Sequence, residues 1–157
     1  MTILLDTREP DPHPWPPFWP DATTERATLA CGDVCLSGNA DVAVERKTPE
    51  DLLSCMTASR DRFERELRRA THLASFAVVV SGSLADLLQR RRGLAVASIL
   101  GTLAAWQRRY RHPFVFAGND GLAADFTWRF LVQPFREAKG LMSQCNRATH
   151  KHELATA

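Results

Sequence analysis

Two acidic residues and a lysine within residues 32–51 have the types and the spacing of a metal-dependent catalytic site. Asp33 is followed twelve residues later by Glu45, Arg46 and Lys47. Carboxylates are the hard oxygen ligands that Mg²⁺ and Mn²⁺ prefer, and one or two suffice when waters and a substrate phosphate complete the coordination. A lysine beside a bound metal can orient or deprotonate an attacking water and offset charge on a phosphorane. These residue types therefore indicate metal-assisted phosphodiester hydrolysis.

Two predicted strands would bring these side chains together. The run 41–47 is short, rich in β-branched residues and preceded by turn-forming residues, which is typical of a strand. Because side chains alternate along a strand, Glu45 and Lys47 should lie on one face and Arg46 on the other. Residues 31–36 are predicted as an antiparallel neighbour, and the hairpin between the two strands would return the preceding aspartate towards Glu45.

The order of these motifs resembles that of the nuclease domain of the XPF-type structure-specific endonucleases, a branch of the PD-(D/E)XK nucleases. The family pattern is Gly-Asp, a spacer, Glu-Arg-Lys, three residues and Asp. It is present here as Gly32-Asp33, Glu45-Arg46-Lys47 and Asp51.

Further matches extend the resemblance over most of the chain. Residues 6–9 match the family's Asp-x-Arg-Glu at the end of its first strand, and residues 60–67 match its first long helix. The likeness runs from about residue 3 to about residue 137. It looks closest to the short, single-domain members of phages and bacteria.

The resemblance implies a Mg²⁺- or Mn²⁺-dependent DNA endonuclease that cuts branched, flap or junction DNA during repair or recombination. It implies that Asp33, Glu45 and the backbone carbonyl of Arg46 bind the metal, and that Lys47 serves the attacking water. Asp6 and Glu9 would complete the acidic site, directly or through water. A homodimer paired through the later helices is also implied. A non-catalytic DNA-binding or partner subunit of the same family remains the alternative, although the chain keeps every Glu-Arg-Lys residue.

Two of these residues have structural alternatives. Thr48 as N-cap, Pro49 at the first helical position and Asp51 at the third make an ordinary helix start, so Asp51 is either a cap or a catalytic support. Arg46, on the opposite face of its strand, could instead form a buried ion pair with an acid from the first strand or helix.

DNA-binding residues are predicted from local charge, because the net charge is only +2. The candidates are Arg8, Arg60 and Arg62. For the clusters 90–92 and 108–111, DNA contact and an ordinary solvated helix face both remain open.

Aromatic residues in the proline-rich segment 10–20 are further candidates. Most residues there are Pro or precede Pro, so the segment should be a stiff, extended loop rather than a helix. Trp15 and Trp19 could stack on unpaired bases beside the site, or could cover the core.

The remaining pattern alternates strands and helices, which predicts one α/β domain with a restriction-endonuclease-like mixed sheet flanked by helices. The domain should span residues 1–142, with a loosely ordered polar tail over 143–157. The predicted strands are 2–7, 76–81 and 113–117. The predicted helices are 49–73, 84–91, 96–110 and one from about 122 that Pro134 should end or kink.

Other features agree with a cytoplasmic protein of a bacterial cell or phage-infected host. The four cysteines have no CxxC spacing and are expected to be reduced thiols. The most apolar stretch, residues 94–106, is shorter than the roughly 20 residues needed to cross a bilayer. We expect no signal peptide, no membrane partner and no nucleotide cofactor.

Overall fold

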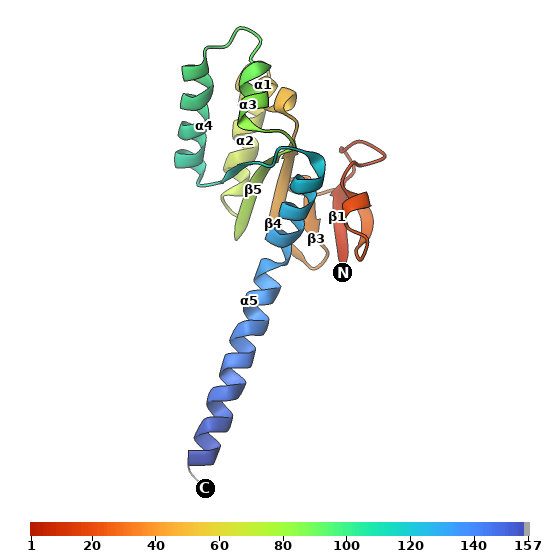
Figure 1. Ribbon diagram of the computed structural model, residues 1–157, viewed down its shortest axis with the longest axis vertical. Helices are drawn as coiled ribbons and strands as arrows, with labels where there is room; N and C mark the ends of the chain where they lie inside the picture. The colour runs from red at the N-terminus through yellow and green to blue at the C-terminus, as the bar shows by residue number, and fades with distance from the viewer. Residues whose placement is uncertain (156–157) are drawn as a thin grey trace.

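The computed structural model describes the backbone of residues 1–155 and the side chains of residues 1–140. Within that backbone, six strands form one sheet in the order β2-β1-β3-β4-β5-β6. The strands are β1 (Thr2–Asp6), β2 (Thr23–Ala27), β3 (Val34–Leu36), β4 (Asn39–Lys47), β5 (Ser75–Val80) and β6 (Phe114–Phe116). Only β3 runs antiparallel to its neighbours, so the sheet is mixed, as expected (Figure 1).

The helices of the described chain are α1 (Pro49–Met56), α2 (Arg60–Ala70), α3 (Leu84–Gln89), α4 (Val96–Tyr110) and α5 (Asp120–Ala155), with a 3-10 turn η1 (Pro16–Phe18). The predicted bounds of α4 are confirmed, and those of α3 are within two residues. Pro134 was predicted to end or kink the last helix. It does not end the helix, because α5 continues through it, so the first of these two alternatives is wrong.

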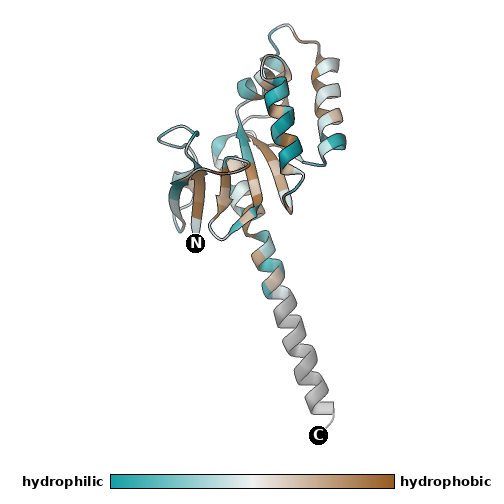
Figure 2. Cartoon of the chain, turned by 180° about the vertical axis from the view of Figure 1, so that it is seen from behind, coloured by the Kyte–Doolittle hydropathy of each residue, from teal (hydrophilic) through white to brown (hydrophobic). Residues whose placement is uncertain are grey.

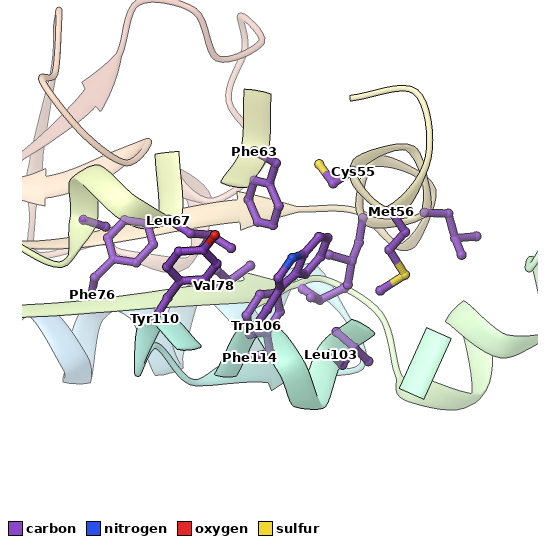
Figure 3. Close-up of a cluster of buried hydrophobic side chains, with 14 of the residues drawn as sticks. Cys55, Met56, Phe63, Leu67, Phe76, Val78, Leu103, Trp106, Tyr110 and Phe114 are labelled. Atoms are coloured by element: carbon purple, nitrogen blue, oxygen red, sulfur yellow. The ribbon is translucent and has the colours of Figure 1, made fainter. Parts of the chain in front are cut away.

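Helices cover both faces of the sheet. Alternate residues of β5 divide between two cores: Phe76 and Val78 pack with α1, α2 and α4, whereas Ala77 and Val79 pack with the η1 loop and α5. Figure 3 shows the first core, where Phe63 of α2 lies above Trp106 and Phe114. The hydrophobic residues gather on the strands, while α2 is mostly hydrophilic apart from the face that reaches this core (Figure 2).

Two expectations about elements are corrected, and one strand was not predicted. The predicted helix 49–73 is broken between α1 and α2, where Thr57 takes a non-helical conformation and its hydroxyl donates to the carbonyl of Leu53. β2 was not predicted, because this edge strand is largely exposed and lacks an apolar alternation. The proline-rich segment contains the short turn η1 instead of remaining extended throughout.

The sheet direction determines where the motifs meet. β1, β4, β5 and β6 run the same way, since β3 is antiparallel to both β1 and β4. Their carboxyl ends therefore share one end of the sheet, where the segment after β1 and the last residues of β4 lie. This end carries the candidate site.

Residues 143–155 fall within the helical backbone of α5. The side chains of residues 141–157 lie outside the described part, so the domain boundary at residue 142 and the loose tail stay predictions. Among described side chains, Cys31, Cys35 and Cys55 are free thiols. Of the helices in the described chain, none is both long and apolar enough to traverse a bilayer.

Candidate active site

A cavity of about 280 Å³ lies between the carboxyl end of β4 and helix α2, and we call it the Glu45 cavity. It is lined by Arg8, Asp33, Glu45, Lys47, Cys55, Arg62, Phe63, Glu66 and Arg69. The hairpin of β3 and β4 brings Asp33 to the side of Glu45 and Lys47, as the strand alternation predicted. Arg46 points to the other face of the sheet.

Glu45 and Lys47 form a buried ion pair within this cavity. Glu45 is 2% exposed, and the Lys47 ammonium donates to its Oε1 and, at 3.1 Å, to the carbonyl oxygen of Arg46. Burial raises the pKa of Glu45, with Lys47 opposing it. Burial lowers the pKa of Lys47, but Glu45 and Asp33 outweigh it and raise that pKa overall. Among described atoms, Glu45 Oε2 is buried without a hydrogen-bond partner.

Asp33 is fixed by its backbone. Its amide donates to the carbonyl of Val44 at 2.8 Å, and one carboxylate oxygen accepts from the amide of Arg46 at 2.8 Å. Gly32 precedes it with φ of 75°, and an added Cβ there would lie 3.1 Å from the Val44 carbonyl oxygen. The tight approach to β4 therefore requires glycine. Burial, then Glu45, raises the pKa of Asp33 well above its ordinary value of 3.8.

This raised pKa predicts how the stability of the protein without bound metal depends on pH. The contribution of Asp33 to stability is fully present below its unfolded pKa of 3.8 and is lost as pH rises through the higher folded value. We expect Asp33→Asn to match the wild type in stability near pH 4 and to exceed it increasingly towards neutral pH. Urea unfolding in EDTA across this range measures the difference, and a pH-independent gap would contradict the prediction.

Arg46 occupies the opposite face of β4 in an ion pair with Glu9. Its Nη1 lies 3.3 Å from Glu9 Oε2, and its guanidinium stands 5.8 Å from the ring centre of Trp15. His13 Nε2 lies 3.4 Å from the same Glu9 oxygen. Burial raises the pKa of Glu9, but His13 and Arg46 lower it below its usual value overall. The structural alternative for Arg46 is thus observed, and Glu9 does not line the Glu45 cavity.

Asp6 differs from the expectation that it would complete the acidic site. It is 0% exposed, and both oxygens accept from Arg8, at 2.6 and 2.9 Å. The backbone amides of Arg8 and Leu29 donate to it as well, each at 2.8 Å. The Arg8 hydrogen bond lowers the pKa of Asp6 to about 2. Asp6 therefore anchors Arg8 at the rim of the cavity and does not line the cavity itself.

The expectation that Trp15 and Trp19 stack on DNA is corrected. Their exposures are 0% and 5%, and their indole nitrogens donate to Asp120 and to the carbonyl of Ala124. Both rings belong to the core under α5, because α5 supplies the acceptors that buried indole N–H groups need. The alternative that these rings cover the core is confirmed.

The arginines of α2 separate into two groups. Arg62 lines the Glu45 cavity. Arg60 faces α4, where it pairs with Glu64 at 3.0 Å and stands 5.6 Å from the ring centre of Trp106. Arg8 and Arg62 thus lie at the cavity, whereas Arg60 lies outside it and contacts Trp106 of α4; DNA binding by these three arginines stays a prediction.

Four cavity residues were not predicted as site residues: Cys55, Phe63, Glu66 and Arg69. Glu66 and Arg69 lie four and seven positions after Arg62, so helical spacing would have placed all three on one face of α2. Cys55 gave no such signal. Burial raises the pKa of its thiol to about 11, which keeps it protonated and poorly nucleophilic.

Asp51 forms a capping box with Thr48 and does not line the cavity. Its Oδ2 accepts from the Thr48 hydroxyl at 2.7 Å, and its amide donates to that hydroxyl at 3.1 Å. The same arrangement recurs at α3, where Ser83 and Asp86 cap the helix. The helix-cap alternative for Asp51 is therefore observed.

We expect Asp51→Ala to lower the free energy of unfolding by about 0.5–2 kcal/mol, because it removes one half of a capping box. Urea denaturation measures the loss, and Asp86→Ala is a matched control that should lose a similar amount. DNA cleavage, the activity that the resemblance implies, should be unchanged in the folded Asp51→Ala protein. An inactive variant with unchanged stability would instead assign Asp51 to the chemistry.

The donor set fits a hard divalent cation. Glu45 Oε2 has no partner among described atoms, and the charge of Glu45 helps to raise the pKa of Asp33, so the two carboxylates repel each other. The carbonyl of Arg46 opens to the same side, since Lys47 contacts it. Within the described residues, no three His, Cys, Asp or Glu side chains come together to form a metal site by themselves. A cation here would therefore rest on two carboxylates, that carbonyl, water and substrate oxygens.

The mixed sheet, its flanking helices and the cavity at the end of β4 define a restriction-endonuclease-like α/β protein. The ERCC4 domain family model matches residues 19–130, and the chain belongs to this family. The resemblance to the XPF-type nuclease domain is thereby confirmed. None of the curated proteins matches the chain.

Solved structures support the same fold. XPF from Aeropyrum pernix is 21% identical with a TM-score of 0.70, and the match covers 85% of this chain and 61% of that one. XPF from Aeropyrum pernix in complex with DNA is 20% identical with a TM-score of 0.67, covering 87% of this chain and 66% of that one. The chain thus spans less than two thirds of either structure.

Proposed function

We propose that the chain is a Mg²⁺- or Mn²⁺-dependent DNA endonuclease that hydrolyses phosphodiester bonds at branched, flap or junction DNA. The observation that carries this proposal is the convergence of Asp33, Glu45 and Lys47 on one cavity, with a buried Glu45 oxygen that lacks a partner among described atoms. Family membership supports the reaction class. A role in repair or recombination is part of the proposal.

The residues would divide the work as follows. Asp33, Glu45 and the Arg46 carbonyl would hold the cation, which supplies Lewis-acid polarisation of the phosphate and a more acidic bound water. Lys47 spans Glu45 Oε1 and the Arg46 carbonyl, so it fixes both donors before substrate arrives. Its ammonium would also orient the attacking water and balance negative charge developing on the phosphate.

DNA would be held at the cavity rim by Arg8, Arg62 and Arg69. All three side chains are exposed, and their guanidinium groups suit phosphate oxygens. Arg8 is pre-oriented by its bidentate contact with Asp6. The complex of the Aeropyrum protein with DNA supports this class of ligand.

Labelled flap, fork, four-way-junction and linear duplex DNA, each incubated with Mg²⁺, Mn²⁺ or EDTA, test the proposal. We expect cleavage of at least one branched substrate with either metal and none in EDTA. Binding without cleavage under every metal condition would favour the alternative, a non-catalytic DNA-binding or partner subunit. Cleavage of linear duplex as fast as that of the branched substrates would show that the protein has no preference for branched DNA.

A homodimer is also proposed, paired through α4 and α5. Val96 and Leu100 lie one turn apart on α4 and are 39% and 41% exposed, and Phe135 of α5 is 43% exposed. Apolar side chains in such positions favour a protein interface. Ile99 and Leu131 belong to the core, so they do not contribute.

Light scattering at micromolar concentration should give twice the monomer mass of 17.6 kDa. The double variant V96D/L100D should shift the protein to the monomer, because two charges at an apolar interface are costly to desolvate. A wild-type protein that is both monomeric and active would contradict the dimer.

A further inference from the structure

A second cavity, of about 290 Å³, borders the opposite side of α1, and we call it the Arg92 cavity. It is lined by Glu50, Leu53, Ser54, Thr57, Ala58, Arg91, Arg92 and Leu94. Cys55 of the same helix lines the Glu45 cavity. Because successive helical residues are turned by about 100°, Cys55 and the pair Ser54 and Thr57 face different sides. One helix therefore separates the two cavities.

The lining of the Arg92 cavity is suited to an anion. Arg91 and Arg92 are exposed, and the hydroxyls of Ser54 and Thr57 stand at the same cavity. Glu50 is the one acid among the lining residues, and its carboxylate is already paired with Arg90, which precedes the two lining arginines. Arginine forks and hydroxyl groups are the common side-chain partners of DNA phosphates.

The loop that carries these arginines holds a defined and unfavourable conformation. Arg92 has φ of 48° and Gly93 has φ of 86°, and the amide of Leu94 donates to the carbonyl of Arg91 at 2.8 Å. A glycine takes a left-handed conformation without penalty, whereas an arginine does not. The strained backbone of Arg92 is consistent with a role for its side chain, although Arg111, the C-cap of α4, also has a positive φ.

The width of α1 indicates how far along the DNA strand, counted from the scissile bond, a phosphate held in the Arg92 cavity would lie. An α-helix with its side chains is roughly 10–12 Å across. The rise along one DNA strand is about 3.4 Å per nucleotide. A DNA strand that crosses the width of α1 from one cavity to the other therefore passes about three nucleotides. The loop between α3 and α4, which carries Arg91 and Arg92, is seen in Figure 1.

We propose that the Arg92 cavity binds a backbone phosphate about three nucleotides from the scissile bond and so sets the register of the DNA on the enzyme. This inference rests on the proposed function, since it names a second contact for the same substrate. Arg91 and Arg92 are the positioning residues, and the Ser54 hydroxyl supplies a further hydrogen bond, whereas the Thr57 hydroxyl already donates to the carbonyl of Leu53.

Fluorescence anisotropy in EDTA separates DNA binding from cleavage. Flap DNA is titrated with the wild type, with R91Q/R92Q, and with R136Q/K139Q, which removes two exposed charges from α5. We expect R91Q/R92Q to bind about tenfold more weakly and to reduce the slope of log K against log salt by about one, the loss of one phosphate contact. The α5 control should change neither value by as much.

A neutral methylphosphonate, moved along the strand one position at a time, locates the contact. Neutralising the phosphate about three nucleotides from the cut should weaken wild-type binding and leave R91Q/R92Q unaffected. Arg92→Gly provides a folding control, because glycine suits this backbone: its melting temperature should be equal or higher while its affinity falls.

The possible outcomes are distinct. Equal affinity and salt slope for wild type and R91Q/R92Q, or an equal loss in the α5 control, would overturn the phosphate contact while leaving the nuclease proposal intact. A wild-type protein that binds none of the DNA structures would overturn both.

Discussion

Asp33→Asn and Glu45→Gln are each expected to lower the rate of DNA cleavage by at least ~10²–10³. In the proposed mechanism, each removes a carboxylate charge at the point where a cation and a developing phosphorane would be stabilised, and one such element typically carries that factor. The amides keep the size of the side chains, and the amide oxygen introduced by Asp33→Asn could still accept from the Arg46 backbone N–H. The measurement is single-turnover cleavage of flap DNA at saturating protein.

The two variants should still fold and bind DNA. At neutral pH Asp33→Asn should be at least as stable as the wild type, because it relieves the burial and like-charge repulsion that raise the pKa of Asp33. Glu25→Gln on the exposed strand β2 is a matched control that should leave both rate and stability unchanged. Near wild-type cleavage by Glu45→Gln would refute the assigned site.

Lys47→Met is expected to lose cleavage by a similar factor and, unlike Asp33→Asn, to lose stability. Methionine keeps the length of the side chain but leaves Glu45 as an unpaired buried charge, which costs about 3–5 kcal/mol. Urea denaturation and single-turnover cleavage of the same preparation measure the two effects.

A double-mutant cycle with Glu45→Gln separates the structural and chemical parts of the Lys47 effect. The double variant should regain most of the stability lost by Lys47→Met, since no unpaired charge remains, yet it should stay inactive. Recovery of cleavage in the double variant would show that Lys47 acts only by holding the fold.

The core of the site could be predicted because it depends on local rules. Strand alternation placed Glu45 and Lys47 on one face and Arg46 on the other, and a tight hairpin returned Asp33 to their side. The capping box at Asp51 likewise follows from residues three positions apart. In each case neighbours along the chain determine the geometry.

The parts that sequence did not predict depend on distant contacts. The burial of Trp15 and Trp19 depends on acceptors from α5, more than a hundred residues away. The residues next to Trp15 and Trp19 in the sequence do not predict that α5 supplies these acceptors. Asp6 does not line the Glu45 cavity, because Arg8, two residues away, and the distant Leu29 together supply four hydrogen bonds to it. Helical spacing predicts that Glu66 and Arg69 lie on the same face of α2 as Arg62. It does not predict that this face of α2 borders the site.

The most direct test of the proposed metal site is a Mn²⁺ titration of metal-free protein with labelled flap DNA, in which EPR follows free Mn²⁺ and a gel follows cleavage. We expect no cleavage before metal is added and a rate that rises with Mn²⁺ occupancy of the wild-type protein. The Asp33→Asn and Glu45→Gln double variant should bind DNA without taking up the metal or cutting. Cleavage by the metal-free wild type, or equal Mn²⁺ uptake and cleavage by the double variant, would contradict the site.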